Sequence, residues 1–185
     1  MKNLIKGVFT LILLYSCAAA YGQQTLSTPQ FRSEFLNYIN RVREKGCNCG
    51  IKYMAPAPPL TWNYQLEVAA IGHATDMSNK NYFSHTSLDG RNMRDRMAAS
   101  DYTMNGYRTF MIGENIAFGQ HSIPEVMQAW LNSEGHCKNL MNPRFKEIGI
   151  AESNSYWVQD FGGREPFTPE QQRLLKSGQY RIVHQ

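Results

Sequence analysis

The sequence contains no apolar run long enough to cross a membrane as a helix. The longest candidate, residues 8–14, is far shorter than the roughly 20 residues that such a helix needs. The chain also has no basic stripe with interleaved aromatic residues, so the sequence gives no reason to expect that it binds nucleic acid. Repeats and low-complexity segments are absent too, and the 185 residues match one ordinary domain.

The first 22 residues are typical of a secretory signal peptide. Lys2 and Lys6 give a basic start, the short apolar run follows, and Ala20 and Gly22 are small residues before a cleavage site. Cleavage before Gln23 would lower the net charge of the chain from +4 to +2, because two lysines are lost. An alternative is that residues 14–17 form a lipoprotein cleavage box in which Cys17 is acylated.

The mature chain would keep three cysteines. An exported protein can hold a disulfide, but Cys47 and Cys49 are too close in sequence to bridge each other easily. One of these two with Cys137 is the expected pair, and the third thiol is left over. A zinc site built from all three cysteines is an alternative with weak ligand spacing.

Helical signals dominate the first half of the chain. Thr28 followed by Pro29 predicts a helix over residues 29–45, with Arg43 away from its apolar face. A Gly-, Cys- and Pro-rich segment follows, and a second helix is expected after Asn63. His73 lies on the apolar stripe of that second helix and is expected to be buried. A short third helix is predicted over residues 93–99.

The second half mixes strands with helices. Residues 107–119 are strand-like, and a capping box at Ser122 begins a helix that should end near Gly135, which places His136 just after it. Strands are expected over residues 146–152 and 156–161, with Gly162 and Gly163 closing the domain. A short terminal helix should begin after Thr168. This order predicts an α+β fold or three-layer α-β-α packing.

Three side chains have the chemistry of a metal or acid–base site. His85 and His136 each follow a helix in this prediction, and Glu114 interrupts an apolar strand. Glu114 could serve as a general base acting on a metal-held water. Nucleophilic alternatives are weaker: Cys137 adjoins His136 and would point away from it, and Ser133 near His136 has no acid placed behind the histidine.

Six short motifs together resemble the CAP superfamily (cysteine-rich secretory proteins, antigen 5 and pathogenesis-related 1), especially its bacterial secreted members. The resemblance covers about residues 29–163. The motifs are His73-Ala74-Thr75-Asp76-Met77, Phe83-Ser84-His85-Thr86, Gly113-Glu114-Asn115-Ile116-Ala117, Trp130 through Gly135-His136, Asn142-Pro143 and Tyr156-Trp157-Val158-Gln159.

The resemblance implies an α-β-α sandwich with a groove lined by two histidines and two acidic residues. His85, His136 and Glu114 match three of these four groove residues. Ser133 stands where the family has its second glutamate, with Glu134 next to it. Cys49 and Cys137 resemble a bridged pair of bacterial relatives. The implied organisation is a signal peptide over 1–22, a CAP domain over 23–163, and a short helix and tail over 164–185.

The expected function is therefore that of a secreted CAP-domain protein that binds a ligand or partner without catalysis. Its groove could hold a divalent cation on His85 and His136, with zinc preferred and magnesium or calcium as alternatives. Alternative functions are a metal-dependent peptide or ester hydrolase, and an extracellular lipid- or glycan-binding protein. The partner would be a small ligand, lipid, glycan or protein, and the location secreted or periplasmic, or lipid-anchored through Cys17.

The processing of the amino terminus gives the first testable prediction. We expect the exported protein to begin at Gln23, because the small residues at positions 20 and 22 suit a signal peptidase. Intact-mass spectrometry of the protein from a secreting host measures this directly. A mass that includes a diacylglyceryl group on Cys17 would establish the lipoprotein form instead.

Overall fold

The computed structural model describes residues 28–179, so the predicted signal peptide, Cys17 and Gln23 lie outside the described residues. Its centre is a four-stranded sheet in the order β3-β5-β6-β4. These strands are β3 (Thr61–Trp62), β5 (Glu147–Ser153), β6 (Tyr156–Pro166) and β4 (Tyr107–Phe118). β3 is parallel to β5, and the other neighbours are antiparallel.

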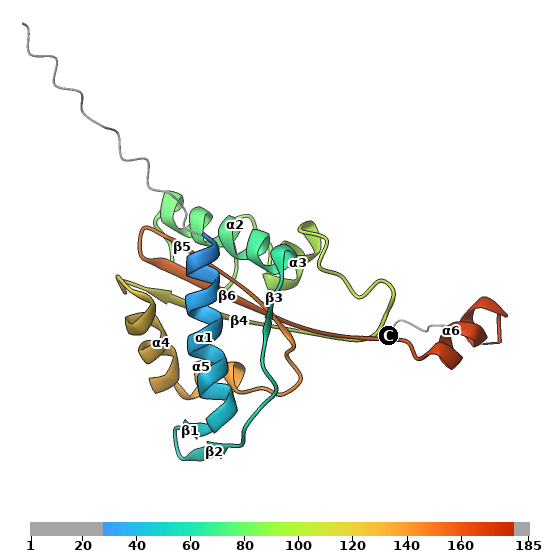
Figure 1. The fold of residues 1–185 in the computed structure, drawn as a ribbon. Coiled ribbons are helices and arrows are strands. Elements are labelled where there is room, and N and C mark those ends of the chain that lie inside the picture. The colour runs from blue at the N-terminus through green and yellow to red at the C-terminus, as the bar shows by residue number, and fades with distance from the viewer. Residues whose placement is uncertain (1–27, 180–185) are drawn as a thin grey trace, which may run out of the picture.

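Helices cover both faces of this sheet (Figure 1). α2 (Tyr64–Lys80) packs on β5 and β6, and α3 (Met93–Ala99) lies beside α2. The other side carries α1 (Pro29–Lys45), α4 (Ile123–Asn132) and α5 (Glu134–Leu140). A small hairpin of β1 (Cys47–Cys49) and β2 (Lys52–Met54) lies next to α5. The arrangement confirms the predicted α+β, three-layer fold.

The main core lies between the sheet and the layer of α1 and α4. Thr28, Asn63 and Ser122 cap α1, α2 and α4 through their side chains, as the sequence predicts. The apolar faces of α1 and α4 then meet the inward side chains of β5 and β6. This core includes the fully buried side chains of Phe35, Ile39, Trp130, Ile148, Ile150 and Phe161.

Arg43 corrects one prediction, because it is fully buried rather than turned away from the apolar face of α1. Its guanidinium donates to the carbonyls of Pro58, Leu140, Asn142 and Phe145 at 2.6–3.3 Å. Burial lowers the pKa of Arg43 to about 10. The side chain is held inside because the carbonyl at the end of α5 and three carbonyls of irregular backbone need donors there.

The helix predicted to end near Gly135 is in fact two helices. α4 ends at Asn132, Ser133 is extended (φ −93°, ψ 118°), and α5 begins at Glu134. His136 therefore lies within a helix and not after one. Gly135 does not end α5, because a glycine in a helix costs only about 1 kcal/mol relative to alanine.

The glycine pair at 162–163 does not end the sheet, because β6 continues to Pro166 opposite β4. A Cβ at Gly162 would lie 1.9 Å from Tyr102 Oη, and one at Gly163 would lie 2.1 Å from the Arg144 carbonyl oxygen. The two glycines therefore mark close packing against the strand.

α6 (Pro169–Lys176) follows the Thr168 capping box and lies apart from the layers (Figure 1). The domain boundary at 163 stays a prediction.

A disulfide joins Cys49 to Cys137, in agreement with the predicted bridge, and Cys47 is a free, half-buried thiol. The bridge links the β1–β2 hairpin to α5 across 88 positions of sequence. Closing so long a loop in the unfolded chain is worth about 4–5 kcal/mol in the chain-entropy description. The covalent link therefore fixes the short helix that carries His136.

The contact between α2 and β5 gives a prediction for Gly149. A Cβ at this position would lie 2.0 Å from the backbone nitrogen of Glu67, so Gly149→Ala should push α2 off the sheet. We expect a loss of about 3 kcal/mol in unfolding free energy, measured by urea denaturation. Gly72→Ala in α2 is the control, because a Cβ at position 72 would meet nothing within 4 Å. This substitution should slightly stabilise the protein, since alanine favours a helix more than glycine does. Equal stabilities for the two variants would contradict this packing.

Candidate functional site

Glu114 lies at the centre of the candidate site, on the edge strand β4. Its carboxylate is almost entirely buried and contacts two cationic or titratable groups. Oε1 lies 2.7 Å from His85 Nδ1, and Oε2 accepts a hydrogen bond from Arg96 Nη2 at 2.6 Å. Burial alone would raise the pKa of Glu114, but the hydrogen bond from His85 and the charge of Arg96 lower it. Glu114 is therefore a carboxylate at neutral pH.

Arg96 also shapes the loop that carries His85. Its Nη1 donates to the carbonyls of His85 and Arg91 and to Ser87 Oγ, at 3.0–3.3 Å. Arg96 comes from α3 and is only 5% exposed. One guanidinium thus joins the strand carboxylate to the backbone of the histidine loop. The sequence analysis did not single out this residue.

His73 supports the same loop from the core. The side chain is fully buried, as predicted, and its Nε2 lies 2.9 Å from the carbonyl oxygen of Ser84. Because a carbonyl only accepts, Nε2 carries the proton. Burial lowers the pKa of His73, with a further contribution from the charge of Arg96, so the ring is neutral. His73 holds the residue next to His85 and is not itself presented to a ligand.

His136 reaches the site from α5, on the other side of the edge strand. An amide network fixes α5 to β4: Asn139 donates to Asn115 Oδ1 at 2.9 Å, and Asn115 donates to Gln159 Oε1 at 2.9 Å and to the His136 carbonyl at 3.2 Å. Burial lowers the pKa of the half-buried His136 imidazole, and the nearby His85 lowers it further. His136 is therefore a neutral imidazole at pH 7, which is the form that binds metal.

Asp160 is a second buried acid that the sequence analysis missed. It lies directly opposite Glu114 in the β4–β6 register and is 1% exposed. Neither of its carboxylate oxygens has a hydrogen-bond partner within residues 28–179. Burial and the negative charge of Glu114 raise its pKa well above the usual range. Asp160 is therefore a protonated, neutral acid opposite the ionised Glu114.

The two residues predicted for the family's fourth groove position, Ser133 and Glu134, have these contacts in the structure. Glu134 is exposed, pairs with Lys138 one turn along α5, and lies beside Gly50 of the hairpin turn. Ser133 makes no side-chain cap for α5. No ion pair or hydrogen bond joins either side chain to His85, Glu114 or His136 within residues 28–179. Within the sheet, Asp160 is the acid directly opposite Glu114.

His85 and His136 are the two imidazoles that the sequence analysis assigned to a cation. Glu114 occupies His85 Nδ1, so Nε2 is the ring atom available to a ligand. Over residues 28–179, the only group of three metal-ligating side chains with donor atoms within 4.8 Å of one another is Cys47, Cys49 and Cys137. His85, Glu114 and His136 therefore do not form a compact three-donor cluster.

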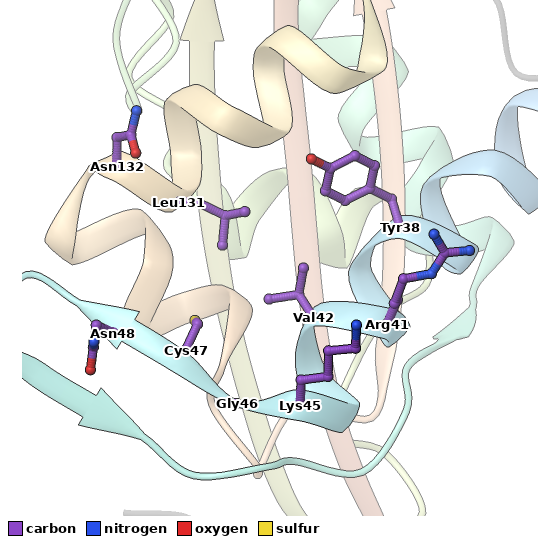
Figure 2. Close-up of a pocket in the computed structure, with 9 residues that line it drawn as sticks. All are labelled: Tyr38, Arg41, Val42, Lys45, Gly46, Cys47, Asn48, Leu131 and Asn132. Atoms are coloured by element: carbon purple, nitrogen blue, oxygen red, sulfur yellow. The ribbon is translucent and has the colours of Figure 1, made fainter.

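A separate cavity of about 510 Å³ opens between α1, the start of the hairpin and α4 (Figure 2). Tyr38 and Val42 from α1 face Leu131 from α4, and Arg41 and Lys45 contribute two cations to the lining. Cys47, the first residue of the hairpin, lines the same cavity. No residue of the site around the two histidines lines it, so the structure offers two distinct surfaces.

Comparison with known proteins agrees with this architecture. The model of the cysteine-rich secretory protein family, CAP, matches residues 36–161. The uncharacterized protein YkwD of Bacillus subtilis (strain 168) is 43% identical over 140 residues, or 75% of this chain and 49% of YkwD. This chain thus spans about half the length of that relative.

Several solved structures are similar to this chain, and two are described here. An extracellular protein containing an SCP domain from Bacillus anthracis str. Ames gives a TM-score of 0.59 at 31% identity, covering 72% of this chain and 43% of that one. An outer surface protein of Borrelia burgdorferi gives 0.61 at 22% identity, covering 77% and 99%. The second likeness concerns the fold alone.

No helix within residues 28–179 is long and apolar enough to cross a membrane.

The buried ion pair predicts a strong effect of Glu114→Gln on stability. The substitution leaves Arg96 buried without a carboxylate, and breaking such a pair costs about 3–5 kcal/mol. Urea denaturation should show this loss. Glu134→Gln is the matched control, because its pair with Lys138 is exposed and its removal should leave the midpoint unchanged. If both variants unfold like the parent, Glu114 does not anchor the loop.

Proposed function

Since the chain belongs to the cysteine-rich secretory protein (CAP) family, we propose that it is an exported CAP module that binds a ligand or partner through the surface around His85 and His136. The observation that supports this most is the 2.7 Å contact between His85 Nδ1 and Glu114 Oε1. That contact orients the ring and leaves Nε2 available on a mostly exposed side chain. The His85 ring is thus oriented before any ligand arrives.

A divalent cation is the ligand best matched to this donor set. His85 Nε2 and the His136 imidazole would hold it, with water completing the coordination. Imidazole donors favour zinc, whereas magnesium and calcium prefer oxygen ligands, so zinc is the cation proposed here. Zinc with two protein ligands would bind less tightly than the catalytic sites that keep three. A bound zinc would supply Lewis-acid polarisation to a ligand or water.

The environment of Glu114 argues for binding over hydrolysis. A general base must have a free oxygen and a pKa near the working pH. Both carboxylate oxygens of Glu114 are engaged, and the pKa of the group is lowered. Asp160 is neutral and buried, so it does not replace Glu114 as a base. The proposed role of Glu114 is therefore to orient His85 and to neutralise Arg96.

A second candidate is glycan binding by an aromatic trio near the histidine loop. Phe83 and Phe118 are each about half exposed (51% and 53%). Their ring centroids lie 6.4 Å apart, and Phe118 lies 4.3 Å from Tyr156. Phe83 is two residues before His85, so a ligand that stacks on the trio could also reach the imidazole. A sugar ring is the class of ligand that suits an exposed aromatic platform beside polar groups.

Zinc titration by calorimetry tests the proposed metal role. His85→Ala and His136→Ala should each abolish binding, and Glu114→Gln should weaken it by about 10–100-fold because the ring loses its orienting partner. Affinity should fall as the pH drops below the ordinary histidine range, because the pKa of His136 is lowered by burial and protonated imidazole does not bind metal.

His121→Ala is the matched control, because His121 contacts Ser155 and not the site. The titration uses the oxidised protein, and a Cys47→Ser variant excludes zinc bound to thiols. If both histidine variants bind zinc like the parent, the surface is not a metal site. The aromatic trio would then be the better candidate for ligand contact, with His85 as a polar neighbour.

A further inference from the structure

Three sulfur atoms meet where the hairpin touches α5, although only two of them are bonded. The disulfide joins Cys49 and Cys137, and the free Cys47 Sγ lies 3.7 Å from Cys137 Sγ. All three sulfurs lie within 4.8 Å of one another. A free thiol in van der Waals contact with a disulfide sulfur lies close to its reaction partner, and rotation of the Cys47 side chain would bring it into line with the Cys49–Cys137 bond.

We propose that Cys47 exchanges with this disulfide, so that the bridge can move between two positions. The Cys47 thiolate attacks Cys137 Sγ, a Cys47–Cys137 bond forms, and the Cys49–Cys137 bond breaks. Cys49 leaves as a thiolate and takes up a proton from solvent, which replaces the proton that Cys47 gave up. The exchange conserves all atoms and electrons and therefore needs no external oxidant or reductant.

The strand geometry of β1 explains why two cysteines can reach the same partner. Successive side chains in a strand point to opposite faces, so residues two apart share a face. Cys47 and Cys49 flank Asn48 in β1, and they pair with Met54 and Lys52 of β2. The Cys-x-Cys spacing that prevents an easy bridge between its own members thus presents both thiols to Cys137.

Burial decides which bridge predominates. Cys49 is fully buried, whereas Cys47 is half-buried and lines the open cavity of Figure 2. A free thiol at Cys47 is therefore better solvated than one at Cys49, and the Cys49–Cys137 bridge is the major isomer. Burial raises the pKa of the Cys47 thiol, so little thiolate exists at neutral pH and exchange is slow.

Either bridge keeps α5 attached to the hairpin. The exchange moves the point of attachment two residues along β1, or about 6–7 Å, without releasing the helix. Because Cys137 follows His136 directly in α5, both isomers tether the helix that carries the site histidine. The inference stands on the sulfur geometry and does not depend on the metal proposal.

Differential alkylation of the intact, oxidised protein tests the exchange. After several hours at pH 8, free thiols are trapped with N-ethylmaleimide in acidic guanidinium, and bridged cysteines are then reduced and labelled with iodoacetamide. Fragmentation of the tryptic peptide of residues 46–52 distinguishes the label on Cys47 from that on Cys49. We expect mostly Cys47 to carry N-ethylmaleimide, with a minor fraction on Cys49 that does not change with protein concentration.

Two variants make the outcome decisive. Cys47→Ser cannot exchange and sets the background for label on Cys49, so a parent protein at that background overturns the proposal. Cys49→Ser should form the Cys47–Cys137 bridge in a glutathione buffer. If it keeps two free thiols while its circular dichroism is native, the proposal is wrong as well. Should Cys49→Ser fail to fold, the labelling of the parent against Cys47→Ser still decides the question.

Discussion

The pair between Glu114 and Arg96 is the interaction on which the candidate site depends. It joins the edge strand to α3 inside the protein, where both side chains are almost fully shielded from water. The remaining donors of Arg96 hold the backbone around His85. A buried pair of this kind need not add stability relative to apolar residues, but it fixes one geometry, because either charge left alone would be costly. The position of the His85 ring follows from that constraint.

The same constraint explains the opposite states of two neighbouring acids. Glu114 and Asp160 lie across from each other on one face of the sheet, and a single buried arginine pairs with Glu114. Two carboxylates this close cannot both ionise readily. Glu114 takes the charge because Arg96 and His85 hydrogen-bond to it, and Asp160 stays protonated because it has no such partners within residues 28–179. The buried charges at this site therefore balance as one carboxylate, Glu114, and one guanidinium, Arg96.

Local patterns in the sequence predicted the elements well, and long-range contacts explain the errors. A cap such as Thr28 follows from neighbouring residues alone, whereas the break at Ser133 reflects the packing of α5 against β4 and the hairpin. Charged residues on helices are usually solvated, so the burial of Arg96 could not be predicted without its distant partner Glu114. Asp160 interrupts an apolar strand just as Glu114 does, but that signal points to a site only once the register places the two acids opposite each other.

The two site histidines are positioned by independent supports that meet at β4. His85 is held through Glu114, Arg96 and the Ser84 carbonyl, whereas His136 is held through the amide network and the disulfide-bonded α5. Each support consists of the chain's own hydrogen bonds and covalent links, and β4 is the strand common to both. This construction contrasts with small domains that fold only around their metal. A ligand at this surface would meet a preformed site, so its affinity would not be reduced by the cost of ordering the protein.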